Sequence, residues 1–242
     1  MTVYDDTYYV SEIFESIQGE GNYAGMFCLF IRFHFCNLTC NWCDTKYTWW
    51  ENSGPYKKFT RDQLIERIKN SKAHHIVFTG GEPTLFRLDL LWVEGKKFHV
   101  ETNGTLIPTE KVELQLIDGT SLSRDEMDTD VVKNFNWVVS PKLKNSHQQK
   151  AISQAEQQKY LKYWAEKKWG IFKFIIKEAN DLKEIDEIVK QFNIDKQMIF
   201  IGIEGQSLQS QIQPALVEEI IKYEFNFSPR LHVMLWGAKR AK

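Results

Sequence analysis

Long apolar runs and an excess of charge of one sign are both missing from this sequence. No stretch approaches the ~18 consecutive apolar residues that a membrane-spanning helix needs. The first residues, MTVYDDTYYV, contain two acids and lack the apolar core of a signal peptide. The formal net charge is −1, so no basic surface for a nucleic-acid backbone is indicated. We therefore expect a cytoplasmic protein that binds neither membrane nor nucleic acid.

Internal repeats, low-complexity stretches and linkers rich in Pro, Gly and Ser are also missing. The chain has 242 residues, of which 43% are hydrophobic and 26% charged, as in an ordinary globular protein. This length is sufficient for one α/β domain with a full hydrophobic core. We therefore predict a single domain that spans residues 1–242.

Short β-rich runs alternate with helical patterns along the chain. Helices are predicted after a capping box that begins at Thr60, near 153–168, and after Asn180, and a further helix is predicted from the spacing of Leu208, Ile212, Leu216 and Ile220. The predicted strands lie at about 26–35, 75–78, 97–101, 136–140, 171–176, 198–201 and 231–235. This alternation predicts βαβ units and a mostly parallel sheet. Because residues 106–136 are less regular, we expect an abbreviated set of crossovers rather than a complete eightfold barrel.

Polar residues and glycines gather where the predicted strands end. In an α/β barrel, the carboxyl ends of the strands form the active-site face. One such cluster alone is weak support, but five together predict a functional site at this edge of the sheet. The five clusters are Cys36, Thr79-Gly80-Gly81-Glu82, Glu101-Thr102-Asn103, Ser140-Pro141-Lys142 and Glu204-Gly205.

Three of the four cysteines, Cys36, Cys40 and Cys43, lie within eight residues. Cytoplasmic thiols stay reduced, so cysteines there indicate metal binding or catalysis rather than disulfides. The spacing C-x3-C-x2-C offers three thiolates from one loop, and thiolates are the ligands of iron–sulfur clusters. Three cysteines on a four-iron cluster leave one iron open to a small molecule. The spacing therefore predicts a [4Fe–4S] cluster.

Two other interpretations of the cysteines stay open. A structural zinc site prefers four ligands and would have to recruit Cys28, His34 or His74. Three unrelated buried cysteines are disfavoured by the polar residues between them. Cys28 itself lies in a predicted strand, where we interpret it as a small core residue.

The cysteine loop resembles the signature of the radical S-adenosylmethionine superfamily. Residues 78–83 resemble the GGE motif of that superfamily, whose backbone and carboxylate receive the methionine amino group, and residues 100–104 resemble the segment that contacts the ribose. The resemblance implies a partial, abbreviated (β/α)6-type radical SAM barrel that binds a [4Fe–4S] cluster and S-adenosyl-L-methionine. A polar turn is the alternative interpretation of each segment. The residues implied at the cofactor are Thr79, Gly80, Gly81, Glu82, Glu101, Thr102, Asn103, Ser140, Lys142 and Glu204.

A closer resemblance covers nearly the whole chain. Residues 12–21, 30–32, 43–46 and 228–237 resemble segments of 7-carboxy-7-deazaguanine synthases. That family converts 6-carboxy-5,6,7,8-tetrahydropterin to 7-carboxy-7-deazaguanine with loss of ammonia, in 7-deazapurine (queuosine-type) biosynthesis. The resemblance implies a radical SAM carbon–nitrogen lyase, in which a 5′-deoxyadenosyl radical takes a hydrogen from the pterin. No catalytic residue beyond the cofactor is expected.

Arg32 is a candidate ligand of the substrate carboxylate. In the predicted strand the odd positions are apolar, so Arg32 lies on the opposite face, where a guanidinium could bind a carboxylate with two hydrogen bonds. A structural salt bridge is the alternative. The resemblance adds Gln18, Gly19, Glu20 and His232 as substrate-binding residues, although a core histidine is as good an interpretation of His232.

Thr45 resembles the Mg²⁺ ligand of the family; from the residues alone, it would be a local hydrogen-bonding side chain. The resemblance also implies a small-molecule pterin substrate, flavodoxin or ferredoxin as the electron donor, and a homodimer.

Two other functions stay open. One is a different small radical SAM enzyme, such as a glycyl-radical activase, and the other is a zinc-stabilised binding module without catalysis.

Overall fold

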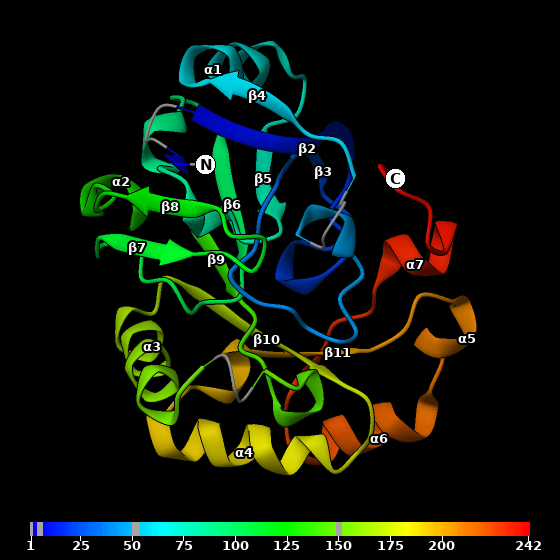
Figure 1. The fold of residues 1–242 in the computed structure, drawn as a ribbon. Helices are drawn as coiled ribbons and strands as arrows, with labels where there is room; N and C mark the ends of the chain where they lie inside the picture. Colours follow the sequence, from blue (N-terminus) through cyan, green and yellow to red (C-terminus); the bar gives the residue numbers. More distant parts are fainter. Residues whose placement is uncertain (1, 4–6, 50–53, 149–151) are drawn as a thin grey trace.

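A nine-stranded sheet forms the centre of the protein (Figure 1). The structure is a computed structural model that describes residues 2–3, 7–49, 54–148 and 152–242. The strand order is β12-β11-β10-β9-β6-β5-β3-β2-β4. Neighbouring strands from β3 to β12 are parallel, whereas β2 is antiparallel to both β3 and β4. The predicted α/β class with a mostly parallel sheet is thus confirmed.

The strands of this sheet are β2 (Thr7–Ile17), β3 (Phe27–Phe33), β4 (Lys57–Thr60), β5 (His75–Gly80), β6 (Lys97–Thr102), β9 (Asn136–Val139), β10 (Gly170–Ile176), β11 (Ile199–Ile203) and β12 (Asn226–Phe227). A second, three-stranded sheet contains β1 (Thr2–Val3), β7 (Val112–Gln115) and β8 (Ser121–Arg124). The helices are α1 (Arg61–Asn70), α2 (Thr129–Val132), α3 (Gln154–Lys167), α4 (Asp181–Phe192), α5 (Leu208–Gln211), α6 (Pro214–Lys222) and α7 (Leu231–Trp236).

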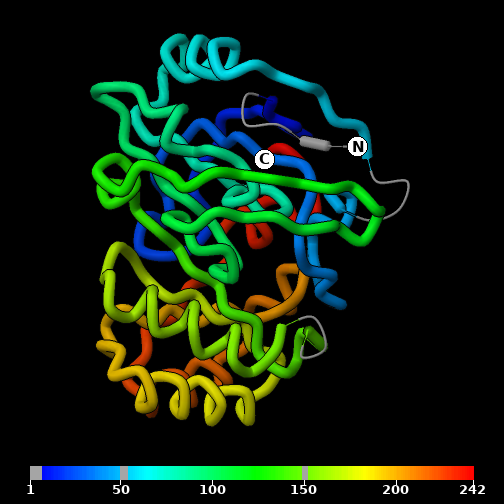
Figure 2. Tube along the Cα trace, turned by 60° about the vertical axis from the view of Figure 1, so that its left-hand side comes forward, coloured from blue at the N-terminus to red at the C-terminus, as the bar shows by residue number. Residues whose placement is uncertain are grey.

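The crossover between β6 and β9 is abbreviated, as the irregular stretch 106–136 predicted. It contains the antiparallel β7–β8 hairpin and the single-turn helix α2 in place of a full crossover helix. Figure 2 shows the two hairpin strands lying beside each other across the molecule. Arg124 on β8 is buried, and its guanidinium donates to the main-chain oxygens of Ile107 and Pro108, which holds the hairpin against the preceding loop.

Helices α3, α4 and α6 lie together along one outer side of the sheet, and α1 lies at the opposite end beside β4 (Figure 1). Helix α1 begins with the predicted capping box, in which Thr60 Oγ1 accepts from the Gln63 amide and the Gln63 side chain accepts from the Thr60 amide. Its buried residues, Leu64 and Ile68, complete the apolar face. Helix α4 starts where predicted, but Asn180 makes no side-chain cap; Asp181 instead accepts from the Lys177 main-chain amide.

Two predicted elements differ from the structure. Residues 231–235 form helix α7 and not a strand, because a short apolar run fits both periods and the pattern alone does not decide between them. The helix predicted from the spacing Leu208 to Ile220 is divided into α5 and α6. Pro214 cannot donate a main-chain hydrogen bond, so it starts a new helix. As a result Leu208 and Ile212 are exposed, while Leu216 and Ile220 are buried.

The sheet does not close into a full barrel, since β12 and β4 are its two edge strands. The segment between β12 and α7 crosses the open side and binds the loop after β2. Ser228 Oγ accepts from the Gly21 amide at 2.7 Å, and the Leu231 amide donates to the Gly19 oxygen at 2.9 Å. Among the described helices, none is long and apolar enough to cross a membrane.

Candidate active site

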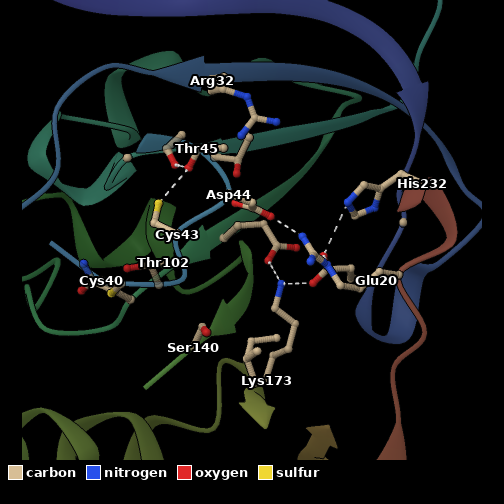
Figure 3. A pocket seen from close by; sticks show the side chains of 18 of the residues that line it. Glu20, Arg32, Cys40, Cys43, Asp44, Thr45, Thr102, Ser140, Lys173 and His232 are labelled. Atoms are coloured by element: carbon tan, nitrogen blue, oxygen red, sulfur yellow. Dashed lines mark hydrogen bonds and ion pairs between the residues drawn. The ribbon is translucent and has the colours of Figure 1, made fainter. Parts of the chain in front are cut away.

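One pocket lies at the carboxyl ends of the parallel strands, where the polar clusters were predicted to meet (Figure 3). Strands β3, β5, β6 and β10 each contribute side chains from their last residues, and the loops beyond them complete the wall. Of the predicted site residues, only Glu82 is not part of the lining. The others are Gln18, Gly19, Glu20, Arg32, Cys36, Cys40, Cys43, Thr45, Thr79, Gly80, Gly81, Glu101, Thr102, Asn103, Ser140, Lys142, Glu204 and His232.

The cysteine loop forms one wall of the pocket. The sequence predicts a strand over 26–35 that ends at Cys36, but β3 ends at Phe33, and Cys36 lies in the loop beyond it. Cys36 and Cys40 are buried and Cys43 is partly exposed. The Trp49 indole donates to Cys43 Sγ at 3.2 Å. N–H donors of this kind stabilise a sulfur ligand that carries negative charge.

The donor set of this loop fits an iron–sulfur cubane. Among the described residues, no three His, Cys, Asp or Glu side chains converge closely enough to bind one metal ion, whereas in a cubane each cysteine binds a different iron. Burial raises the pKa of the Cys36 thiol, and the nearby Glu82 carboxyl raises it further, so the thiol is protonated without metal. Binding of iron would displace this proton, because a coordinating thiol is deprotonated by the charge of the metal.

Cys28 takes no part in this wall, as predicted. It is buried on β3 beside Phe30 and Val77, and its thiol donates to the Met26 oxygen. Burial raises the pKa of Cys28 to about 11, which is typical of an inert core thiol. His34, one of the proposed zinc ligands, is instead bound to Ser11 Oγ at 2.9 Å.

Two glycines allow the end of β5 to touch the cysteine loop. The Gly81 amide donates to the Phe33 oxygen at 3.1 Å, and the next amide donates to the Phe35 oxygen at 2.8 Å. A Cβ atom on Gly81 would collide with the Phe35 oxygen, and Gly80 has φ +134°, which disfavours side chains. The pair of glycines is therefore required for the end of β5 and the chain leading into the cysteine loop to lie in main-chain contact.

Glu82, the one predicted site residue outside the pocket lining, has its carboxylate hydrogen-bonded within the protein. It is fully buried and accepts hydrogen bonds from the Thr84 amide and hydroxyl, the Thr102 hydroxyl and the Asn103 amide, at 2.6–2.9 Å. Its four donors leave the carboxylate satisfied within the protein. The structure thus shows Glu82 fixing the end of β6, where Thr102 and Asn103 line the pocket.

Lys173 on β10 holds two carboxylates of the pocket. Its Nζ lies 2.7 Å from Glu20 Oε2 and 2.7 Å from Glu101 Oε2 (Figure 3). Burial alone would lower the pKa of Lys173, but Glu101 and Glu20 outweigh it and raise the pKa above its ordinary value. The ammonium therefore stays charged and joins the predicted substrate side of the pocket to the predicted ribose side.

Arg230, before α7, is a second cation at Glu20. Its Nε donates to Glu20 Oε1 at 3.0 Å, and its Nη2 is paired with Asp44 of the cysteine loop. Burial by itself raises the pKa of Glu20, but Lys173, Arg230 and His232 together bring it well below its ordinary value. Glu20 is consequently a carboxylate at neutral pH.

His232 and Gln18 complete this side of the pocket. His232 lies on α7 and its Nε2 is 3.9 Å from Glu20 Oε1; burial lowers the pKa of the imidazole, which favours the neutral ring. Gln18 Nε2 donates to Glu101 Oε1 at 3.1 Å. Between them, Gly19 touches the His232 ring so closely that a Cβ atom would collide with it.

Arg32 and Thr45 lie on the wall nearest Cys43 (Figure 3). Arg32 Nε donates to Glu12 Oε2 at 2.9 Å, so the salt bridge considered as an alternative is present, while the side chain also lines the pocket. Thr45 Oγ1 lies 3.5 Å from both the Gly80 oxygen and Cys43 Sγ.

Lys173, Arg230 and Asp44 were not singled out from the sequence, although they form the ionic centre of the pocket. A signal was available for Lys173, because a charged residue inside the apolar strand Ile-Phe-Lys-Phe-Ile has to be paired when buried. Asp44 and Arg230 lie within quoted motifs, but their mutual contact depends on a loop packing that spacing does not reveal.

Comparisons with known proteins agree with this site. The model of the radical SAM superfamily matches residues 30–119. A 7-carboxy-7-deazaguanine synthase of Rhodopirellula baltica is 30% identical, covering 96% of this chain and 87% of the relative. The synthase of Hyperthermus butylicus is 30% identical, covering 93% and 92%, and that of Pyrobaculum aerophilum 28% identical, covering 96% of each chain.

The solved structures agree as well. The crystal structure of QueE from Escherichia coli has a TM-score of 0.65 at 25% identity and covers 93% of this chain and 95% of that one. Streptococcus suis SuiB, solved with its precursor peptide, has a TM-score of 0.53 at 15% identity and covers 80% of this chain and 46% of that chain. At this identity the comparison shows only that the two folds are similar.

Fold, cysteine loop and family match define a radical SAM enzyme, a class that implies a [4Fe–4S] cluster and S-adenosylmethionine. Within that class, the chain belongs to the 7-carboxy-7-deazaguanine synthase family.

Proposed function

We propose that this enzyme converts 6-carboxy-5,6,7,8-tetrahydropterin to 7-carboxy-7-deazaguanine with loss of ammonia. The observation that carries the proposal is that the Arg32 guanidinium and the Glu20 carboxylate line the same pocket as the cysteine loop. Such a pair suits a molecule with a carboxylate at one end and an aminopyrimidine at the other. When bound, the cluster and S-adenosylmethionine supply a 5′-deoxyadenosyl radical.

The chain itself supplies binding, orientation and shielding from water. Cys36, Cys40 and Cys43 would hold the cluster. Arg32 would bind the substrate carboxylate. Glu20, kept ionised by Lys173 and Arg230, would accept from the amino and ring N–H groups of the pyrimidine, with His232 and Gln18 beside it.

We propose that the cofactor lies against the ends of β5, β6 and β9. Main-chain groups at Gly80 and Gly81 would receive its amino acid part, and Glu101 with Asn103 would bind ribose hydroxyls. The remaining predicted contacts are Thr79, Thr102, Ser140, Lys142 and Glu204, all of which line the pocket. Glu82 would contribute by accepting hydrogen bonds from Thr102 and Asn103, which holds both residues at the pocket.

Thr45 is the proposed Mg²⁺ ligand. Its hydroxyl faces the pocket near the Gly80 oxygen. Mg²⁺ keeps several waters and needs few protein ligands, so a hydroxyl together with substrate oxygens is a sufficient donor set. Titrating the reconstituted enzyme with Mg²⁺ should raise substrate affinity in the native protein, and Thr45→Val should abolish that response.

The central experiment supplies the anaerobically reconstituted enzyme with reductant, S-adenosylmethionine, Mg²⁺ and the carboxypterin, and detects 7-carboxy-7-deazaguanine by mass spectrometry. Arg32→Met should retain its iron and lose turnover through weaker substrate binding. Cleavage of S-adenosylmethionine without consumption of pterin would instead favour another radical SAM reaction, such as a glycyl-radical activase.

We further propose that residues 1–242 form one domain that works in the cytoplasm as a homodimer, with flavodoxin or ferredoxin as the electron donor. Among the described residues, one large sheet carries the pocket, which supports a single domain, and three thiols that need a reducing environment support the cytoplasm. The homodimer and the electron donor are proposed from the family resemblance. Sedimentation of the holoenzyme tests the dimer, and single-turnover reduction with each donor tests the partner.

A further inference from the structure

Glu12, on β2, lies between two arginines behind the pocket wall. It is paired across the sheet with Arg32 of β3, and its Oε2 accepts from Arg32 Nε at 2.9 Å. Its other oxygen, Oε1, accepts from Arg240 Nε at 2.8 Å and lies 2.7 Å from Arg240 Nη2. Neither Glu12 nor Arg240 lines the pocket. They can therefore act on a ligand only without contact, by holding Arg32 and by their charge.

Tyr47 completes the group. Its hydroxyl donates to Glu12 Oε2 at 3.0 Å, and the Arg240 guanidinium lies 3.7 Å from the centre of its ring. Burial raises the pKa of Tyr47 to about 12, so the hydroxyl remains a donor at neutral pH. Both oxygens of Glu12 are thus engaged, and the side-chain exposure of Glu12 is 12%.

The arrangement fixes which edge of Arg32 is free. The Nε edge is occupied by Glu12, and the guanidinium is held 5.9 Å above the Phe14 ring. Within the described part of the chain, the Nη groups of Arg32 make no hydrogen bond. The outer edge of the guanidinium therefore remains available for two parallel hydrogen bonds to a carboxylate.

Charge decides whether this edge attracts a carboxylate. An Arg32–Glu12 pair alone is neutral and would attract an anion weakly. Arg240 adds a second positive charge, so the group of Arg32, Glu12 and Arg240 has a net charge of +1. A substrate carboxylate therefore meets a positively charged group, and its attraction to that group offsets part of the free energy needed to remove it from water.

We propose that Glu12 and Arg240 are positioning residues that determine selectivity for a carboxylated substrate. Glu12 fixes the direction of Arg32, the Tyr47 hydroxyl helps to hold Glu12, and Arg240 compensates the charge of Glu12 so that Arg32 can bind an anion. The inference rests on the proposed role of Arg32 and extends it to residues outside the pocket.

The experiment measures anaerobic equilibrium binding of two probes to the reconstituted holoenzyme: 6-carboxy-5,6,7,8-tetrahydropterin and tetrahydropterin without the carboxylate. Arg240→Met should raise the Kd for the carboxypterin about tenfold and leave that for tetrahydropterin unchanged. Arg240→Lys should restore most of the affinity because it keeps the charge. Arg61→Met is the matched control, since both arginine side chains are 49% exposed.

A double variant separates charge compensation from a structural effect. Glu12→Gln combined with Arg240→Met restores the net charge of +1 through Arg32 alone. It should therefore bind the carboxypterin more tightly than Arg240→Met. The inference is overturned if the double variant is no better, if Arg240→Met behaves as Arg61→Met, or if it weakens both probes equally.

Failure of the proposed function would be seen separately. If Arg32→Met binds the carboxypterin as the native enzyme does, the carboxylate role of Arg32 is wrong and this inference falls with it. If Arg32→Met loses the carboxypterin while Arg240→Met does not, the inference alone is wrong. Iron content and melting temperature of each variant show that the comparison is made on folded, cluster-loaded protein.

Discussion

The carboxylate of Glu20 and the ammonium of Lys173 meet at 2.7 Å inside the pocket, although one lies in the loop after β2 and the other on β10. Lys173 also holds Glu101 at the same distance. One buried ammonium thus allows two carboxylates, which would otherwise repel each other, to lie close together. Because those carboxylates are proposed to face different ligands, we expect Lys173 to couple the binding of substrate to that of cofactor.

Lys173→Met should weaken both ligands and destabilise the fold. Removing one partner of a buried ion pair costs about 3–5 kcal/mol because the remaining charge stays unpaired. We expect a lower melting temperature and at least a tenfold rise in the Kd for the carboxypterin, measured by thermal unfolding and equilibrium binding. Lys177→Met, on the exposed turn after β10, is the control and should change neither.

Cys40→Ala should lose the cluster, whereas Cys28→Ala should retain it. The two cysteines are both buried, but only Cys40 lines the pocket. Iron and acid-labile sulfide, measured after anaerobic reconstitution, should fall to background in Cys40→Ala and stay at the native level in Cys28→Ala. Equal loss of iron in the two variants would contradict the assignment of the ligands.

Gly81→Ala should disturb the cluster although none of the three cysteines is replaced. The added Cβ would collide with the Phe35 main chain, lie 3.1 Å from Cys36 Cβ and push the end of β5 away from the cysteine loop. We expect a loss of stability of about 1–3 kcal/mol and lower iron occupancy. Gly54→Ala, where the nearest atom to a Cβ is 3.5 Å away, should be close to neutral in denaturant unfolding.

His99 should make the protein less stable in acid. Burial lowers the pKa of His99 to about 4, and His75 and Lys97 add to the effect, while the unfolded chain titrates near 6.5. Between these values the unfolded state binds more protons, so stability falls as pH drops from 6.5 toward 4. The contribution is about 1–2 kcal/mol near pH 5. A His99→Gln protein should show a smaller decline in its free energy of unfolding over this range.

The sheet was largely predictable because its central strands are apolar runs with polar residues at their ends. Strands β3, β5, β6, β9, β10 and β11 fall where the sequence predicted strands. By contrast β2 was missed, since polar Glu12, Glu15 and Ser16 interrupt its apolar residues. Its antiparallel register with β3 places Glu12 opposite Arg32. A register between two strands cannot be predicted from the sequence of one strand alone.

The site was predictable where local motifs carry it and less so where distant segments meet. The cysteine loop and the glycines of β5 are short motifs, and the structure brings them together. The orientation of Glu82 could not be read from its motif, because it depends on donors from Thr102 and Asn103 on the next strand. Likewise, Arg230 reaches Glu20 and Asp44 only because the chain returns across the open side of the sheet.

The open side of the sheet links ligand binding to the stability of the fold. Where a closed barrel would have a continuous ladder of strands, this molecule is joined by Arg230, Ser228 and Leu231 to the loop that carries Glu20. Gly19 and Glu20 therefore belong both to this junction and to the proposed substrate contact. We expect a substrate bound there to contact both the loop after β2 and helix α7, so that its binding raises the free energy of unfolding.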